Sequence, residues 1–165
     1  METIPYLVCN EMIPMSLDLL YANDLKTIND LKYTLSAIIN TEAPITLNLI
    51  KKRLRDAFGV KKISDKALAI VLKCLNEFPS TYNLYDSVYW PEDGKFMPKF
   101  IRVGYEREIY DVAYQEMAIL VSKLMNDGLS GDDLYRNVLS FFGFSVLTKK
   151  AKDYLEFVVK MVEKC

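Results

Sequence analysis

The sequence contains no histidine, so it lacks both the commonest general acid/base of enzymes and the commonest metal ligand. Its three cysteines, Cys9, Cys74 and Cys165, are scattered and form no C-x-x-C pair, which argues against a disulfide framework and against a zinc site. No apolar run is long enough to span a bilayer, and the acidic N-terminus is unlike a signal peptide. These absences predict a cytoplasmic protein with no membrane segment, no bound metal and no cofactor.

One stretch of the sequence occurs twice in related form. DAFGVKKISDKAL, at residues 56–68, returns as SFFGFSVLTKKAK at residues 140–152, and an offset of 84 aligns the second and third predicted helices of the two copies without a gap, whereas the first helices match at an offset of 86. The matches fall on apolar positions and on helix-cap positions, as between Ser64 and Thr148, while most charged positions differ. Two diverged copies of one fold would keep such positions and change their surfaces.

Each copy has the pattern of three helices. In the first copy, apolar spacing predicts helices over residues 25–40, 47–58 and 65–75, with Thr46 and Ser64 as N-caps and Gly59 as the residue that ends the second helix. Cys74 lies on the apolar side of the third helix and is predicted to be buried. In the second copy, helices are expected over residues 108–126, 131–142 and 149–165. Ser130 and Asp133 are expected to form a capping box.

The segment between the copies has a different composition. YNLYDSVYWPEDGKFMPKFIRV is rich in aromatic and β-branched residues and has a turn signal at residues 92–95. It predicts a β-hairpin that pairs residues 84–90 with residues 96–103, with Pro98 restricting the second strand to a sheet edge.

The fold predicted from these patterns is mainly α with a minor β part. It consists of two tandem three-helix, winged-helix-like repeats joined by the hairpin. Residues 1–24 would form an N-terminal extension that packs on the core, residues 25–103 the first winged-helix-like unit with its hairpin, and residues 104–165 a second three-helix unit that lacks a wing.

Four stretches carry a resemblance to a known family: TEAPI, AFGVKK, SVYWP and DDLYRNVLSFFGF. Through them, nearly the whole chain resembles a bacterial domain of unknown function. That domain usually forms the C-terminal end of very large superfamily-one helicase/ATPase proteins, which also carry a restriction-endonuclease-like domain. The resemblance implies a helicase/ATPase or nuclease domain as partner and work alongside nucleic acid. No stretch is a catalytic signature and the chain has no P-loop, so it is expected to be an excised domain or a free-standing relative.

The charge distribution indicates where nucleic acid would bind. Residues 51–75 sum to +6, whereas the flanking segments sum to −4 and −3. On the third helix, Lys66, Ala69 and Lys73 form one exposed stripe, and this is the element that enters the major groove in helix-turn-helix proteins. The stripe lacks Arg, Asn and Gln, which favours phosphate contact over base recognition, and the same charges would also suit an ordinary solvated face. The candidate nucleic-acid-binding residues are Lys51, Lys52, Arg55, Lys61, Lys62, Lys66 and Lys73.

The aromatic residues of the predicted hairpin permit two interpretations. They could stack on unpaired bases, or they could pack across strands and join the two copies, which is the commoner role of such a set. The set consists of Tyr82, Tyr85, Tyr89, Trp90, Phe96 and Phe100.

Taken together, these features predict a non-enzymatic accessory or adaptor module of a helicase- or nuclease-type system, with no catalytic residue and with DNA contact through the basic face. The first alternative is a pure protein–protein interaction module whose basic face meets an acidic partner. The remote alternative is a metal-dependent nuclease. Asp86, with Glu92 or Asp93 ahead of Lys95, loosely resembles the carboxylate–carboxylate–lysine set that holds Mg²⁺ in such enzymes.

Overall fold

The computed structural model describes all 165 residues, from Met1 to Cys165. The fold is mainly α, with seven α-helices, one 3₁₀ helix and five short strands, as predicted at this level. Contacts divide the chain into two compact units. The N-terminal unit comprises Leu7–Thr81 and Asp86–Lys95, and the C-terminal unit comprises Met1–Tyr6, Tyr82–Tyr85 and Phe96–Cys165. No helix is both long enough and apolar enough to cross a membrane.

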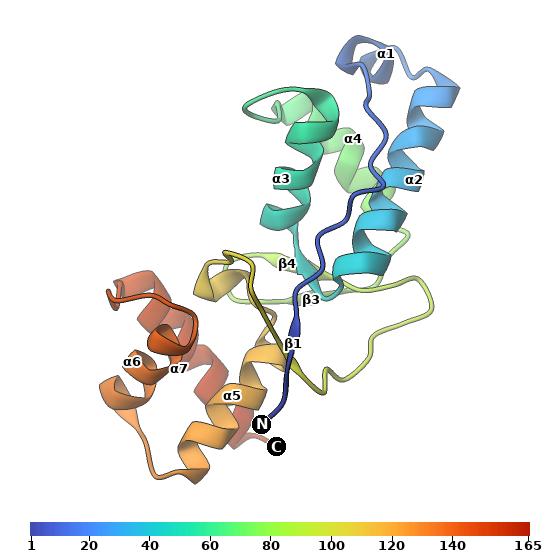
Figure 1. Cartoon of the computed structure of the whole chain (residues 1–165). Coiled ribbons are helices and arrows are strands. Elements are labelled where there is room, and N and C mark those ends of the chain that lie inside the picture. The colour runs from blue at the N-terminus through green and yellow to red at the C-terminus, as the bar shows by residue number, and fades with distance from the viewer. The chain divides into compact units, whose positions relative to one another are not determined.

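The N-terminal unit packs α2, α3 and α4 against one another beside a small sheet (Figure 1). Strand β4 lies in the middle of this sheet, with β2 on one side and β3 on the other, and β2 and β4 are antiparallel with Ile45 opposite Tyr89. The elements are α1 (Leu17–Tyr21), α2 (Leu25–Glu42), β2 (Ile45–Thr46), α3 (Leu47–Phe58), α4 (Asp65–Leu75), β3 (Ser80–Tyr82) and β4 (Ser87–Tyr89).

Side-chain caps determine where the helices of this unit begin. The Thr46 hydroxyl accepts a hydrogen bond from the Leu49 amide, and the Ser64 hydroxyl accepts one from the Ala67 amide. Gly59 ends α3 with a φ of 67°, a left-handed conformation that glycine adopts without strain. The predicted caps and the predicted end of α3 are therefore confirmed, and the predicted burial of Cys74 is confirmed as well.

A buried ion pair joins α2 to α3. Arg53 donates to both carboxylate oxygens of Glu42, at 2.8 Å from Nε and 2.6 Å from a terminal nitrogen, and the Cys9 amide donates to the same carboxylate at 3.1 Å. Glu42 is completely buried and Arg53 is 5% exposed. Because both charged groups are desolvated in the folded protein, each depends on the other for its stabilisation.

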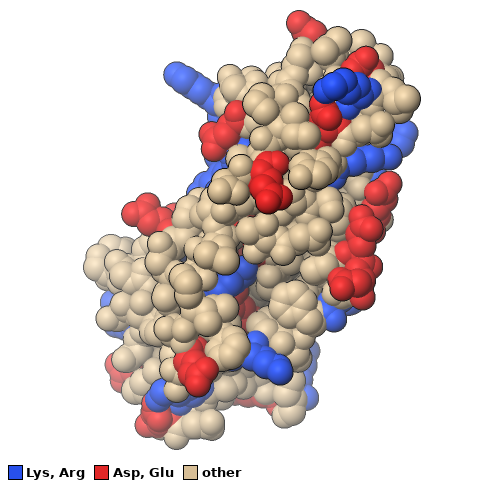
Figure 2. Space-filling view, turned by 45° about the vertical axis from the view of Figure 1, so that its right-hand side comes forward, with Lys and Arg blue, Asp and Glu red and all other residues tan.

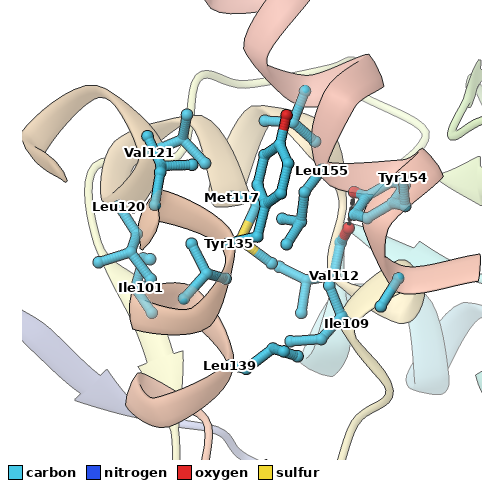
Figure 3. Packing of buried hydrophobic residues seen from close by; sticks show 14 residues of the cluster. Ile101, Ile109, Val112, Met117, Leu120, Val121, Tyr135, Leu139, Tyr154 and Leu155 are labelled. Carbon is cyan, nitrogen blue, oxygen red and sulfur yellow. Dashed lines mark hydrogen bonds between the residues drawn. The ribbon is translucent and has the colours of Figure 1, made fainter. Parts of the chain in front are cut away.

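The C-terminal unit packs α5 against α6 and α7 around an apolar core. Figure 3 shows Met117 and Leu120 of α5, Tyr135 and Leu139 of α6, and Leu155 of α7 within this core. Strand β1 pairs in parallel with β5, and Thr3 lies opposite Ile101. The elements are β1 (Thr3–Pro5), β5 (Ile101–Val103), the 3₁₀ helix η1 (Ile109–Asp111), α5 (Tyr114–Asn126), α6 (Gly131–Phe141) and α7 (Lys149–Glu163).

Asn83 is fully buried in this unit and fixes the entry into α5. Its amide nitrogen donates to the carbonyls of Tyr110 and Val112, and its amide oxygen accepts from the Tyr114 amide and from the Tyr154 hydroxyl. The Tyr154 hydroxyl also donates to the Val112 carbonyl, as the dashed line in Figure 3 marks. These bonds hold Val112 in an extended conformation, so the helix predicted over residues 108–126 is divided into η1 and a shorter α5.

A buried triad lies beneath the N-terminal strand. Glu116 accepts hydrogen bonds from Arg102 and from Arg107, with ion-pair distances of 2.8 and 2.9 Å. The Tyr6 ring covers both guanidinium groups, at 4.6 Å from Arg102 and 4.7 Å from Arg107, and it stacks on Tyr105 with centroids 5.2 Å apart. Tyr6 thereby anchors β1 to the polar centre of this unit.

The triad makes the stability of the protein sensitive to acid. Burial acts to raise the pKa of Glu116, but Arg107 and Arg102 outweigh it and hold that pKa below its usual value. In the unfolded chain the pKa of a glutamate is about 4.3. The unfolded state therefore takes up the proton first, so the contribution of Glu116 to the free energy of unfolding is complete above that pH and is lost as the pH falls toward the folded pKa. Urea unfolding should give a lower free energy of unfolding at acid pH than at neutral pH. For Glu116→Gln, the decrease between the two pH values should be smaller.

Two further predictions of local structure are wrong. The expected hairpin does not form, because β4 pairs with β2, whereas β5 lies in the other sheet beside β1. Val88 and Tyr89 pair with Thr46 and Ile45, which are buried. This pairing is more favourable than the predicted pairing with residues 96–103, a segment that contains Pro98. The expected capping box at α6 is also absent, because the Ser130 side chain makes no capping hydrogen bond.

Candidate nucleic-acid interface

All seven basic residues that the sequence selects belong to the N-terminal unit and occupy α3, α4 and the connection between these helices. The side chains of Lys61, Lys62, Lys66 and Lys73 are exposed, whereas those on α3 are half-buried. None of the seven forms a salt bridge. Their charges are therefore available to an external anion.

The basic segment contributes less exposed charge than its sequence indicates. Arg53 was counted in that segment, but its guanidinium is buried and paired with Glu42, which lies outside it. Lys51, Lys52 and Arg55 lie on the same helix between buried apolar positions such as Leu54, which leaves them partly exposed. The charge available to a ligand on α3 therefore comes from these three side chains.

Helix α4 presents the predicted stripe to solvent. Ala67, Val71 and Leu75 occupy its buried side, and the exposed side carries Lys66 and Lys73. Leu72 is 36% exposed and lies on the exposed side too. Asp65, Ala69 and Asn76 complete this surface. The surface is therefore mixed, with two cations, one carboxylate and the apolar side chains of Ala69 and Leu72.

Helix α1, which the sequence analysis did not identify, orients one of these lysines. The Tyr21 hydroxyl lies 2.7 Å from the Ser64 hydroxyl, at the N-cap of α4, and the Lys66 ammonium lies 4.6 Å from the centre of the Tyr21 ring. A cation above an aromatic face is electrostatically favourable, so Tyr21 restricts where the ammonium points. Sequence spacing contains no signal for this contact, because the two residues are far apart in the chain.

A groove of about 500 Å³ lies between α2 and α4, next to the stripe. Ile28 and Ile70 contribute its apolar surface, and Lys73 lies at its edge. Across it, the Lys32 ammonium lies 3.6 Å from a carboxylate oxygen of Glu77. Burial raises the pKa of the Cys74 thiol, which also lines the groove, so that thiol remains protonated at neutral pH and is a poor nucleophile.

The carboxylates of the nuclease alternative form no metal-binding group. Asp86 accepts hydrogen bonds from the amides of Asn48, at 2.8 Å, and of Ser87, at 2.9 Å, so it stabilises the start of α3. Glu92 and Asp93 are exposed on a turn. No group of three or more Asp, Glu, Cys or His side chains in the chain is arranged to hold a metal ion. The arrangement offers no support for metal-dependent hydrolysis.

The aromatic set of the predicted hairpin is divided between the two units. Tyr89 and Trp90 are buried in the N-terminal unit, where the Trp90 indole donates to the Thr81 hydroxyl at 3.0 Å. Tyr82 and Tyr85 belong to the C-terminal unit and remain exposed. The set is therefore not one stacking surface: within the C-terminal unit, Tyr82 packs edge to face on Phe157 and Tyr85 on Tyr110.

Comparison with known proteins does not place the chain in a family. No protein family, no curated protein and no solved structure matches it. Figure 2 shows that basic and acidic side chains are interspersed over a larger uncharged surface on the face drawn there.

Proposed function

We propose that the N-terminal unit is a winged-helix module that contacts the nucleic-acid backbone through α4. The observation that carries this proposal is the element order α2, β2, α3, α4, β3, β4, with β4 between β2 and β3 in the sheet. In a winged helix with this order, the third helix is the one that lies in the major groove. Helix α4 holds that place, and its exposed side carries Lys66 and Lys73 without salt-bridge partners.

The contact would be made to phosphates. The lysines of α4 are flexible point charges, and the exposed side of this helix lacks arginine, which most often recognises guanine. In this proposal the module has no catalytic role of its own. By the sequence resemblance, its partner would be a helicase/ATPase or nuclease domain, and the module would position that partner on DNA.

Binding should be measured by fluorescence anisotropy on a labelled DNA duplex at about 50 and about 200 mM salt. We expect affinity to fall roughly 100-fold between these salts, as about four phosphate contacts would require. Lys66→Glu combined with Lys73→Glu should abolish binding, because two attractive charges become repulsive ones.

Lys160→Glu combined with Lys164→Glu is the matched control, because both lysines are exposed on or beside α7 and the change in net charge is the same. The control should bind almost as well as the parent protein. Equal loss in both double variants would mean that net charge alone governs binding, and it would contradict an interface on α4.

The second candidate function is protein interaction. Leu72 favours it, because an exposed leucine on the solvent side of α4 suits an apolar contact better than a phosphate backbone. An absence of DNA binding even at the lower salt would support this second function and overturn the first.

A further inference from the structure

The C-terminal unit contains a pocket of about 470 Å³ that the proposed function does not use. Its floor consists of Ile109 and Leu139, which also belong to the apolar core and are labelled in Figure 3. Tyr110 and Phe144 supply aromatic rings, and Lys150 adds a cation. Planar apolar walls with a few polar groups are typical of sites for small aromatic ligands.

Lys150 is held in place by aromatic rings instead of by a carboxylate. Its ammonium lies 3.8 Å from the centre of the Tyr110 ring and 5.0 Å from that of the Tyr85 ring, and the two rings meet edge to face at 6.0 Å. It forms no salt bridge, in contrast to its neighbour Lys149, which pairs with Asp153 at 2.8 Å. The positive charge of Lys150 is therefore not neutralised, although its position is restricted.

We propose that this pocket binds one unpaired nucleotide of a single-stranded nucleic acid. The base would stack on the Tyr110 ring in place of the Lys150 ammonium, and the displaced ammonium would contact the adjacent phosphate. Stacking of a base on an aromatic side chain contributes to affinity for every base, because each base has a π face. A duplex would not fit, since its bases are already stacked and paired.

Glu108 gives the pocket a preference among bases. Glu108 lines the pocket, and a carboxylate there can accept a hydrogen bond from the amino group of cytosine, adenine or guanine, whereas thymine offers no amino group. The same carboxylate repels phosphate, which directs the base inward and the backbone toward Lys150. We expect oligo(dC) to bind roughly tenfold more tightly than oligo(dT), as one discriminating base contact allows.

The test uses the full chain and short fluorescein-labelled oligo(dC) at about 50 mM salt, where phosphate contacts are strongest. Tyr110→Leu removes the ring but keeps an apolar side chain, and Tyr110→Phe keeps the ring. Leucine should weaken binding roughly tenfold, as the loss of one stacking contact implies, and phenylalanine should restore it. Circular dichroism melting of both variants separates loss of the site from loss of the fold.

Lys150→Gln and Lys149→Gln remove the same charge from adjacent positions of α7. Only the change at Lys150 should weaken binding, and it should reduce the slope of log affinity against log salt by about 0.7, as expected for one single-strand phosphate contact. Equal effects of both changes, equal affinity of Tyr110→Leu and Tyr110→Phe, or no binding of oligo(dC) would each overturn the proposal.

The pocket and the α4 surface belong to different units, so their failures can be distinguished. Lys66→Glu combined with Lys73→Glu should abolish duplex binding and leave oligo(dC) binding unchanged. Loss of oligo(dC) binding in that double variant would place the single-strand contact on α4 and contradict the pocket.

Discussion

Replacing Glu116 with glutamine should lower the free energy of unfolding by about 3 to 5 kcal/mol, the usual effect of removing one member of a buried ion pair. The glutamine would leave Arg102 and Arg107 without a counter-charge at sites where little water reaches them. The cost arises from two desolvated cations that are no longer compensated. Urea unfolding followed by far-ultraviolet circular dichroism measures the change.

Two further variants identify the cause of this loss. Glu163→Gln makes the same chemical change at an exposed position of α7 and should alter stability little. Replacing Glu116, Arg102 and Arg107 together by methionine should recover much of the loss, because apolar groups of similar volume need no counter-charge. A loss for Glu116→Gln no larger than that for Glu163→Gln would mean that water solvates the triad, contrary to its burial.

A loss of similar size, about 3 to 5 kcal/mol, should follow Glu42→Gln in the N-terminal unit, again because a buried cation loses its partner. Arg53 would keep a hydrogen-bond acceptor but not a negative charge, and the Cys9 amide would lose part of its charge-assisted bond. Trp90, the single tryptophan of the chain, is buried in this unit, so its fluorescence reports unfolding there.

Glu77→Gln is the matched control for this prediction. Glu77 also pairs with a cation in the same unit, Lys32, but both side chains are about half exposed. Solvent screens such a pair, so its loss should have little effect. Equal unfolding curves for Glu42→Gln and Glu77→Gln would show that the link between α2 and α3 does not depend on the charge of Glu42.

The features that the sequence predicts well are those whose interactions are local. Thr46, Ser64 and Thr148 each accept a hydrogen bond from the amide three residues later, so the start of each helix is encoded within a few positions. The second and third helices also begin 84 positions apart in the two copies, at Leu47 and Gly131 and at Asp65 and Lys149. These starts agree with the offset of the sequence repeat.

The sequence predicts strand pairing poorly here because each strand finds its partner far along the chain. Strand β1, at the N-terminus, pairs with β5 about a hundred residues later, and nothing near either segment indicates that choice. The division of the second copy's first helix has the same origin, because Asn83 is distant in sequence from the Val112 carbonyl that it binds.

Apolar periodicity and capping act over a few residues, so the mainly helical fold, the caps at Thr46, Ser64 and Thr148 and the exposed lysines of α4 could all be predicted from the sequence. Three contacts became apparent only in the folded chain: Glu42 neutralises Arg53, Glu116 lies between two arginines, and the Lys150 ammonium lies over the Tyr110 ring. A charged residue contributes the same signal to the composition and periodicity of the sequence whether its side chain is solvated or buried in the folded protein. Its role follows from which groups the folded chain brings within a few ångströms of it.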